Sequence, residues 1–147
     1  MKPTDDNALA LESQLCFALY STQLAMNKLY RGLLRELELT YPQYLVMMVL
    51  WQQDRQTVSE IGEQLSLDSA TLTPLLKRLE GAGLLTRQRS RQDERQVEVA
   101  LSESGRALRQ RAESIPESVG CAIQCTREEA QQLKEDLHRL RHRLNQA

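Results

Sequence analysis

The sequence predicts a mainly α-helical protein that carries one β-hairpin, and three observations lead to this expectation. Apolar residues recur at helical spacing along most of the 147-residue chain. Thr40, Thr57 and Thr126 each stand three residues before a Gln or Glu, which is the pattern of a capping box at a helix N-terminus. Two short strand-like runs, 84–88 and 96–101, flank a polar segment and predict a hairpin with a long charged tip.

The first long helix is expected over residues 9–37, which hold no proline and a single glycine. Leu15 and Leu19 belong to its apolar stripe, while Phe17 and Leu24 add apolar surface outside that stripe. A helix that is apolar on much of its circumference is buried on more than one side. A chain of this length offers few places for such burial, so a second subunit is predicted to cover part of the helix.

The next helices are bounded by caps and turns. The helix that Thr40 begins is expected to end at residues 52–54, and Thr57 begins a short one. Residues 66–68 form a tight turn, and Asp68 caps a helix over about 69–82 that contains Pro74. The core-facing stripe of this helix consists of four leucines: Leu72, Leu75, Leu76 and Leu79.

The C-terminal part is expected to be helical again. Ser102 caps a helix that is interrupted around Pro116 and Gly120, and Thr126 begins the last helix. His138 and His142 lie one turn apart on that helix, a spacing that can make half of a zinc site. No clear third ligand stands nearby, so we predict a solvated helix face, no metal and no other cofactor.

Composition restricts the class of protein. Apolar residues make up 41% of the chain, enough for a packed core. No stretch approaches the roughly 18–20 consecutive apolar residues of a membrane span. The N-terminus carries Asp5 and Asp6 and no signal pattern, and an odd number of cysteines argues against a secreted disulfide framework. A soluble cytoplasmic protein that makes no membrane contact is expected.

The order helix, tight turn, helix and hairpin over residues 57–101 is that of a winged helix-turn-helix, which binds DNA. The net charge is −1, but residues 77–111 hold nine basic and five acidic side chains. With its leucines buried, the second helix presents five polar side chains to a major groove: Ser69, Thr71, Thr73, Lys77 and Arg78. The hairpin tip can place Arg89, Arg91 and Arg95 in a minor groove. A helical hairpin that packs on itself, with a solvated charged loop, is the alternative.

Residues 57–62 (TVSEIG), 75–80 (LLKRLE), 93–95 (DER) and 101–105 (LSESG) resemble the MarR family of winged-helix repressors, and the resemblance extends over nearly the whole chain. It implies a MarR-like homodimer with dimerisation helices at 5–38 and 102–147. The winged helix-turn-helix region at 40–101 would read near-palindromic double-stranded operator DNA. The resemblance also implies that Arg95 enters the minor groove and that Asp93 holds it by an ion pair.

Cys16 precedes all six aromatic residues of the chain, which lie within residues 17–51. An aromatic core beneath the first two helices accounts for Phe17, Tyr44 and Trp51. A buried tyrosine differs because its hydroxyl seeks a hydrogen-bond partner, and a thiolate can be that partner. Since the thiolate is the form that attacks peroxide, the cluster points to a reactive cysteine.

Residues 15–20 (LCFALY), 28–30 (KLY) and 39–47 (LTYPQYLVM) are similar to the organic-hydroperoxide-sensing branch of the MarR family, called OhrR. The resemblance implies a repressor that binds its operator when reduced and releases it when an organic hydroperoxide oxidises Cys16. Tyr30 and Tyr41 of the partner subunit would bond the sulfur, and Tyr20 falls where a third such tyrosine occurs.

Cys121 lies where the two-cysteine type of this branch carries its resolving thiol. The resemblance therefore implies a sulfenic acid at Cys16, then an intersubunit disulfide with Cys121 that rotates the DNA-binding domains. Cys125 follows Cys121 by one helical turn and could share its face, as a buried bystander or a backup.

Two other function classes stay open at this point. One is a MarR-type repressor that a phenolic or other small ligand releases, with Cys16 incidental. The other is an enzyme, a thiol peroxidase that happens to carry basic residues. The chain lacks a thioredoxin-like βαβ pattern and a Cys-x-x-Cys motif, so an enzyme is not expected.

Overall fold

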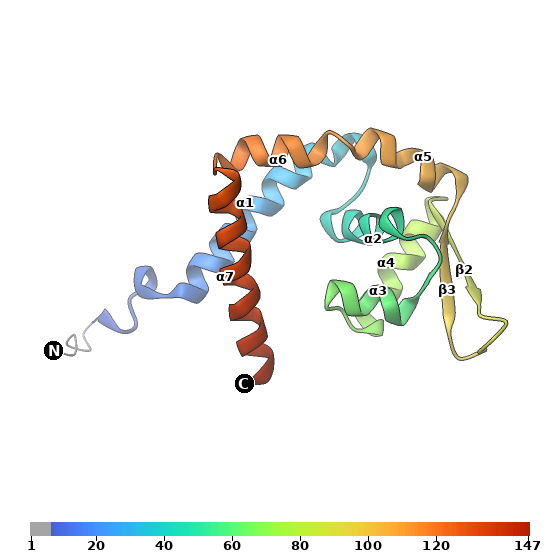
Figure 1. Ribbon diagram of the computed structural model, residues 1–147, viewed down its shortest axis with the longest axis horizontal. Coiled ribbons are helices and arrows are strands. Elements are labelled where there is room, and N and C mark those ends of the chain that lie inside the picture. The colour runs from blue at the N-terminus through green and yellow to red at the C-terminus, as the bar shows by residue number, and fades with distance from the viewer. Residues whose placement is uncertain (1–6) are drawn as a thin grey trace. The chain divides into compact units, whose positions relative to one another are not determined.

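A computed structural model describes residues 7–147, and Figure 1 shows the order of the helices and strands. The chain divides into two compact units between Glu113 and Ser114. The first unit contains η2 (Leu11–Ser13), α1 (Leu15–Leu33), η3 (Arg35–Leu37), α2 (Tyr41–Gln52), β1 (Gln56–Thr57), α3 (Val58–Leu65), α4 (Ser69–Gly81), β2 (Leu85–Arg89), β3 (Val97–Leu101) and α5 (Glu103–Ala112). The second contains α6 (Ile115–Ile123) and α7 (Arg127–Gln146).

The predicted helix-turn-helix and hairpin are confirmed as α3, α4 and the β2–β3 pair. Leu72, Leu76 and Leu79 of α4 are fully buried, and Leu75 beside them is half-buried. They share this core with Ile61 of α3 and with several residues of α2, including Met47 and Leu50. Each such side chain contributes about 1.5–3 kcal/mol on burial, so α4 is held by its apolar face and keeps its other face free.

The sheet contains one strand more than expected. The antiparallel order is β1-β3-β2, with Gln56 and Arg87 opposite Val99 on its two sides. β1 has only two residues and no alternation to reveal it. Gln56 is buried because its amide donates to the Val49 carbonyl oxygen (3.1 Å) and accepts from Gln64 (2.6 Å).

The predicted caps are present at every helix where they were expected. Thr40 forms a complete capping box with Gln43, and Asp68, Ser102 and Thr126 each accept a backbone N–H from the third helical residue. The boxes predicted at Thr57 and Thr126 are only half formed. The Thr57 hydroxyl accepts the Glu60 N–H, but the Glu60 carboxylate bonds that same hydroxyl at 3.2 Å rather than the backbone.

Two helix boundaries differ from the expectation. The helix predicted over 9–37 is three pieces, because Gln14 has an extended backbone (ψ 116°) that separates η2 from α1, and Leu34 (ψ −5°) separates α1 from η3. The break expected around Pro116 and Gly120 lies at residues 113–114 instead. Pro116 occupies the first turn of α6, where its missing N–H costs no hydrogen bond, and Gly120 lies inside that helix.

The helix α1 buries no side chain in the single chain, which agrees with an apolar face left for another partner. Leu15 (62%), Tyr20 (58%) and Leu24 (52%) are exposed. Phe17, expected in the aromatic core, is 39% exposed and belongs to this face, whereas Tyr44 is buried as expected. In residues 7–147 no helix is both long and apolar enough to cross a membrane.

Candidate functional site

The outer face of α4 carries the side chains that were predicted to meet DNA. Ser69, Thr71, Lys77 and Arg78 are exposed, and Thr73 is half-exposed. The turn before α4 is tight, since a Cβ on Gly62 would lie 2.7 Å from the Leu67 carbonyl oxygen. This close approach of α3 to the turn fixes where the N-terminus of α4 points.

The Asp68 carboxylate begins α4 by accepting the Thr71 N–H at 2.8 Å. This backbone hydrogen bond, together with one from the Thr71 side chain, lowers the pKa of Asp68. Asp68 therefore stays ionised as the cap at the end of α4 that carries Ser69 and Thr71.

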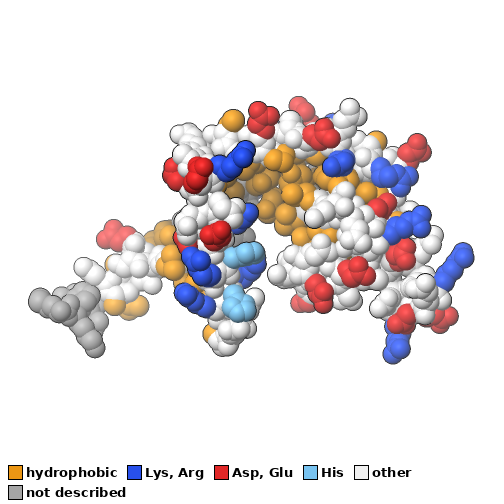
Figure 2. All heavy atoms as spheres, viewed as in Figure 1, with side chains coloured by type: hydrophobic (Ala, Val, Ile, Leu, Met, Phe, Trp, Pro, Cys, Tyr) orange, Lys and Arg blue, Asp and Glu red, His pale blue; other side chains and the backbone are white. Residues whose placement is uncertain are grey.

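The tip of the hairpin, called the wing tip below (residues 90–96), is ordered by its own side chains. The Ser90 hydroxyl accepts the N–H groups of Gln92 and Asp93. The Asp93 carboxylate accepts the Arg95 N–H at 3.0 Å and lies 3.4 Å from its Nε. The Arg95 side chain is 94% exposed, so the ion pair orients a guanidinium that otherwise stands in solvent. Figure 2 shows Lys and Arg side chains protruding at this end of the hairpin.

Several basic residues counted in the sequence are committed to contacts inside the fold. Arg87 binds Glu80 at 3.1 Å and holds β2 against the end of α4. Its hydrogen bonds lower the pKa of the Glu80 carboxyl. Arg106 lies 3.8 Å from Asp54, and Arg111 donates to the Glu36 carbonyl oxygen at 2.7 Å. The charge count of residues 77–111 therefore overstates the positive charge that is free to meet phosphate.

The three cysteines are free thiols on exposed side chains. Cys16 is the second residue of α1, and Cys121 lies in α6. Two expectations for Cys125 are wrong. It is exposed, and it follows the end of α6, where Gln124 takes a left-handed backbone (φ 58°), so it does not share a helix face with Cys121.

Tyr30 and Tyr41 lie together, with ring centroids 4.4 Å apart, and Tyr44 joins them at 5.9 and 6.4 Å. We call these three residues the tyrosine cluster. It joins the last turn of α1 to the first turn of α2. The sequence had placed Tyr44 only in the core, and Tyr20 stands outside the cluster on the exposed face of α1.

Cys16 and Tyr30 are both in α1 and cannot touch within one chain. They are 14 positions apart, and a rise of 1.5 Å per residue puts about 21 Å between their Cα atoms. Any contact between this thiol and the tyrosine cluster must therefore join two copies of the chain.

Burial raises the pKa values of the tyrosine hydroxyls. Desolvation, followed by the neighbouring Tyr41 and Tyr44, raises the pKa of Tyr30 to about 12. Desolvation also raises the pKa values of Tyr41 and Tyr44. At neutral pH all three are neutral hydroxyls that can donate a hydrogen bond to an anion.

We expect an alkaline titration to detect Tyr30 directly. Its folded pKa of about 12 lies above the ordinary 10.0, so the stability it contributes is complete below pH 10 and is lost as pH rises toward 12. In Tyr30→Phe the last phenolate step in ultraviolet absorbance disappears, and chemical unfolding loses less stability across that window. Loss of a phenolate step near pH 10 instead of near pH 12 would contradict this assignment.

A pocket of about 390 Å³ opens beside the cluster, between α1 and the start of α2. Its lining comprises Gln23, Asn27, Arg31, Leu39, Thr40, Tyr41 and Pro42. Its volume lies within the range of sites that hold small organic molecules.

The two histidines of α7 have partners on their own helix. His138 lies 2.6 Å from Arg141, and His142 lies 3.0 Å from Gln146. Among the residues that the structure describes, no group of three or more His, Cys, Asp or Glu side chains could hold a metal.

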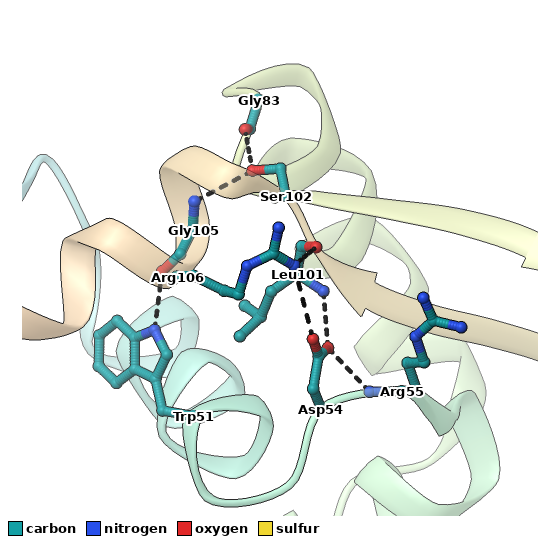
Figure 3. Close-up of polar contacts among 8 residues, drawn as sticks. All are labelled: Trp51, Asp54, Arg55, Gly83, Leu101, Ser102, Gly105 and Arg106. Atoms are coloured by element: carbon teal, nitrogen blue, oxygen red, sulfur yellow. Dashed lines mark hydrogen bonds and ion pairs between the residues drawn. The ribbon is translucent and has the colours of Figure 1, made fainter.

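Sequence reasoning missed a polar network where α2, β3 and α5 meet (Figure 3). Asp54, just after α2, accepts the Leu101 N–H at 2.8 Å, and Trp51 donates to the Gly105 carbonyl oxygen at 2.8 Å. We call Trp51, Asp54, Leu101, Gly105 and Arg106 the α2–wing junction. Asp54 had been assigned only to the end of a helix, and nothing in its local sequence reveals partners about 50 positions away.

The winged helix-turn-helix with its exposed α4 face and pre-ordered wing tip defines a DNA-binding transcription regulator. A family model described as transcriptional regulator SarA/Rot matches residues 28–111. The chain is 46% identical over 138 residues to the organic hydroperoxide resistance transcriptional regulator of Bacillus subtilis, covering 94% of both chains. It is 47% identical over 140 residues to the HTH-type transcriptional regulator TtmR of Methylorubrum extorquens, covering 95% of this chain and 72% of that one.

Among solved structures the chain is similar to AbfR of Staphylococcus epidermidis in several states. The reduced form bound to DNA has a TM-score of 0.80 at 32% identity, covering 97% of this chain and 100% of that one. An overoxidised form bound to DNA scores 0.78, and a disulfide form scores 0.62. The protein belongs to the SarA/Rot family of MarR-type winged-helix transcriptional regulators, in the branch of the organic hydroperoxide regulator OhrR.

Proposed function

We propose that this protein is a homodimeric repressor that holds operator DNA while Cys16 is reduced and releases it when an organic hydroperoxide oxidises that thiol. The observation that carries the proposal is the separation of Cys16 from the tyrosine cluster along one rigid helix. An exposed thiol at one end of α1 and protonated tyrosines at the other form a site only when two copies meet. The name of the Bacillus subtilis relative supports the choice of organic hydroperoxide as the oxidant.

The dimer is formed by the terminal segments, residues 5–38 and 102–147, of which residues 5 and 6 lie outside the described part of the chain, and leaves 40–101 as the DNA-binding region. Exposed apolar side chains of α1 support this division. Leu133 (54%), Leu137 (41%) and Leu144 (62%) do the same on α7. Such a continuous apolar surface on a helix is typical of a subunit interface.

In each subunit α4 enters a major groove and the wing tip enters the adjacent minor groove. Ser69, Thr71 and Thr73 let the backbone approach the base edges, while Lys77 and Arg78 neutralise phosphate. Arg95 reads the narrow minor groove, with Asp93 setting its direction. The DNA-bound forms of the relative AbfR support this arrangement.

The oxidation of Cys16 requires the peroxide as the oxidant and no cofactor. The thiolate of Cys16 attacks the terminal peroxide oxygen, the O–O bond breaks, and the alkoxide leaves as an alcohol after taking a proton. The product is a sulfenic acid. Tyr30 and Tyr41 of the partner subunit stabilise the thiolate by donating hydrogen bonds, and Tyr20 borders the site.

Cys121 then completes the switch. Its thiolate attacks the sulfenic sulfur of the other subunit, an S–S bond forms, and hydroxide leaves as water. The two Cα atoms must come within about 7 Å, so closing the bond moves the helices that carry them. AbfR has both a disulfide form and an overoxidised form that remains on DNA, which favours the disulfide as the releasing event.

Operator binding and crosslinking, measured together, test the proposal. Reduced protein should bind a cognate operator in fluorescence anisotropy and release it after cumene hydroperoxide, with a dimer-sized band on non-reducing electrophoresis. Cys121→Ser should form the sulfenic acid at Cys16, detected with a dimedone probe, and should remain bound to the operator. Release by the wild-type protein without any crosslink would overturn the disulfide step.

Arg95→Ala should weaken operator binding by about 1–3 kcal/mol and reduce the salt dependence by about one phosphate-equivalent. The reason is that the Arg95 side chain is 94% exposed and that, within the described residues, its ion pair is with Asp93. Arg91→Ala, at the same tip but without that orienting ion pair, should cost less. Anisotropy titrations at several salt concentrations measure both, and equal losses would argue against a positioned Arg95.

The pocket beside the tyrosine cluster supports a second candidate, release by a phenolic or other small ligand. Arg31, Gln23 and Asn27 could hold polar groups of such a ligand while Leu39 and Pro42 contact its ring. Release by a phenolic compound that survives replacement of Cys16 would favour this candidate.

A further inference from the structure

The helix α2 connects the tyrosine cluster to the wing. Tyr41 and Tyr44 lie in its first turn, and Trp51 lies in its last. Its 12 residues give a length of about 18 Å. Five of the 12 residues of α2 are buried, with Val46, Met47 and Leu50 fully inside, so we expect the helix to respond to a push at one end by moving as a rigid body rather than by bending.

The far end of α2 is joined by two direct hydrogen bonds to the segment where the wing ends and α5 begins. Trp51 Nε1 donates to the Gly105 carbonyl oxygen, and Asp54 Oδ1 accepts the N–H of Leu101, the last residue of β3. Both bonds are 2.8 Å long. Figure 3 shows them side by side, reaching from α2 to the end of β3 and the start of α5.

Arg106 closes this junction on its other side. Its guanidinium donates to the Leu101 carbonyl oxygen at 3.1 Å and lies 3.8 Å from the second Asp54 oxygen. The first Asp54 oxygen also accepts the N–H of Arg55, whose backbone is left-handed (φ 59°). The Asp54 carboxylate therefore stabilises the turn after α2. It also binds the Leu101 N–H directly and the Leu101 carbonyl oxygen through Arg106.

We infer that Trp51 and Asp54 are positioning residues that transmit the state of the tyrosine cluster to the wing. A shift of Tyr41 when the thiol changes moves α2 as a rod, and the α2–wing junction moves the base of β3 with it. The inference rests on the proposed function, since it names the path by which oxidation reaches the DNA-binding surface.

A different ion pair in the same region offers a matched control. Glu80 and Arg87 also anchor the wing, but their ion pair joins β2 to α4. Loss of this pair should loosen the wing equally in both redox states. Loss of the α2–wing junction should instead separate the wing from the redox state.

The test compares Trp51→Phe/Asp54→Asn with Glu80→Gln by measuring the ratio of operator Kd after and before cumene hydroperoxide. Phe keeps an aromatic ring at position 51, and Asn keeps an acceptor for the Leu101 N–H, so the double variant is expected to fold. Coupling between sites is typically 5–150-fold, so the ratio should fall about fivefold or more in the double variant. It should stay at the wild-type value in Glu80→Gln, and dimedone labelling of Cys16 should be equally fast in all three proteins.

A second readout uses the reciprocity of coupling. In wild-type protein, operator DNA should shift the glutathione concentration ratio at which the disulfide is half reduced, and the double variant should lose that shift. An unchanged Kd ratio in the double variant would overturn the inference while leaving the proposed function intact. A fall in ratio equal to that of Glu80→Gln would also overturn it. A wild-type ratio of one would overturn the proposed function and this inference together.

Discussion

Cys16→Ser should bind the operator as tightly as reduced wild-type protein and should not release it at any hydroperoxide concentration that leaves the protein folded. Serine has nearly the size of cysteine, and Cys16 is exposed in the single chain, so the substitution leaves the packing of α1 unchanged. A serine hydroxyl is not ionised at neutral pH and does not attack peroxide oxygen. Under the proposed mechanism the whole response is lost rather than reduced, because Cys16 performs the first step.

Cys125→Ser is the matched control for that experiment. Its thiol is also exposed but lies beyond the end of α6. Anisotropy with labelled operator, before and after cumene hydroperoxide, should show normal release in Cys125→Ser and none in Cys16→Ser. Release from the Cys16 variant would mean that peroxide acts at another residue. A loss of release in Cys125→Ser would mean that Cys125 takes part in the response.

Local patterns carried most of the fold because local physics decides them. The stripe of Leu72, Leu76 and Leu79 and the caps at Thr40, Asp68 and Ser102 depend on residues three or four positions apart. Such spacing is visible in one dimension. The break at Gln14 is a counterexample, since its side chain bonds the Ala8 and Ala10 carbonyl oxygens and holds an extended backbone that helix propensity does not forbid.

The parts that stayed hidden depend on distant residues. Asp54 and Leu101 are 47 positions apart, and Trp51 and Gly105 are 54 apart, so no window of sequence relates them. The same holds for the arginines, whose charges looked equivalent until Arg87 and Arg106 proved to have internal partners. A charge count therefore locates a DNA-binding region but does not identify its contacting residues.

The thiol site was predicted from resemblance, and helix geometry adds the reason that it needs two chains. Cys16 and Tyr30 are recognisable by type and neighbours, but their separation along α1 is what excludes a site within one chain. The tyrosine cluster also includes Tyr44, a residue that the sequence had placed only in the aromatic core. The pKa of its hydroxyl is raised for the same reason as that of Tyr30, namely desolvation.

Gly105→Ala should destabilise the protein by about 3–4 kcal/mol, combining an overpacked contact with a lost hydrogen bond. A Cβ there would lie 2.0 Å from the Leu84 carbonyl oxygen and 3.0 Å from its carbon, both backbone atoms that cannot rotate away. That oxygen accepts the Ser102 N–H at 3.0 Å, which joins the start of the wing to the start of α5. Moving it breaks this bond and displaces the Gly105 carbonyl that Trp51 holds.

Thermal unfolding at one protein concentration measures the effect, since the Tm of a dimer depends on concentration. For a chain of this size the loss corresponds to a fall in Tm of about 10 °C. Gly81→Ala is the control, because a Cβ at the end of α4 would meet no atom within 4 Å, and its stability should change by less than about 1 kcal/mol. If both variants unfolded at the wild-type temperature, the close contact between Leu84 and α5 would not exist in solution. The α2–wing junction, which includes Gly105, would then lack structural support.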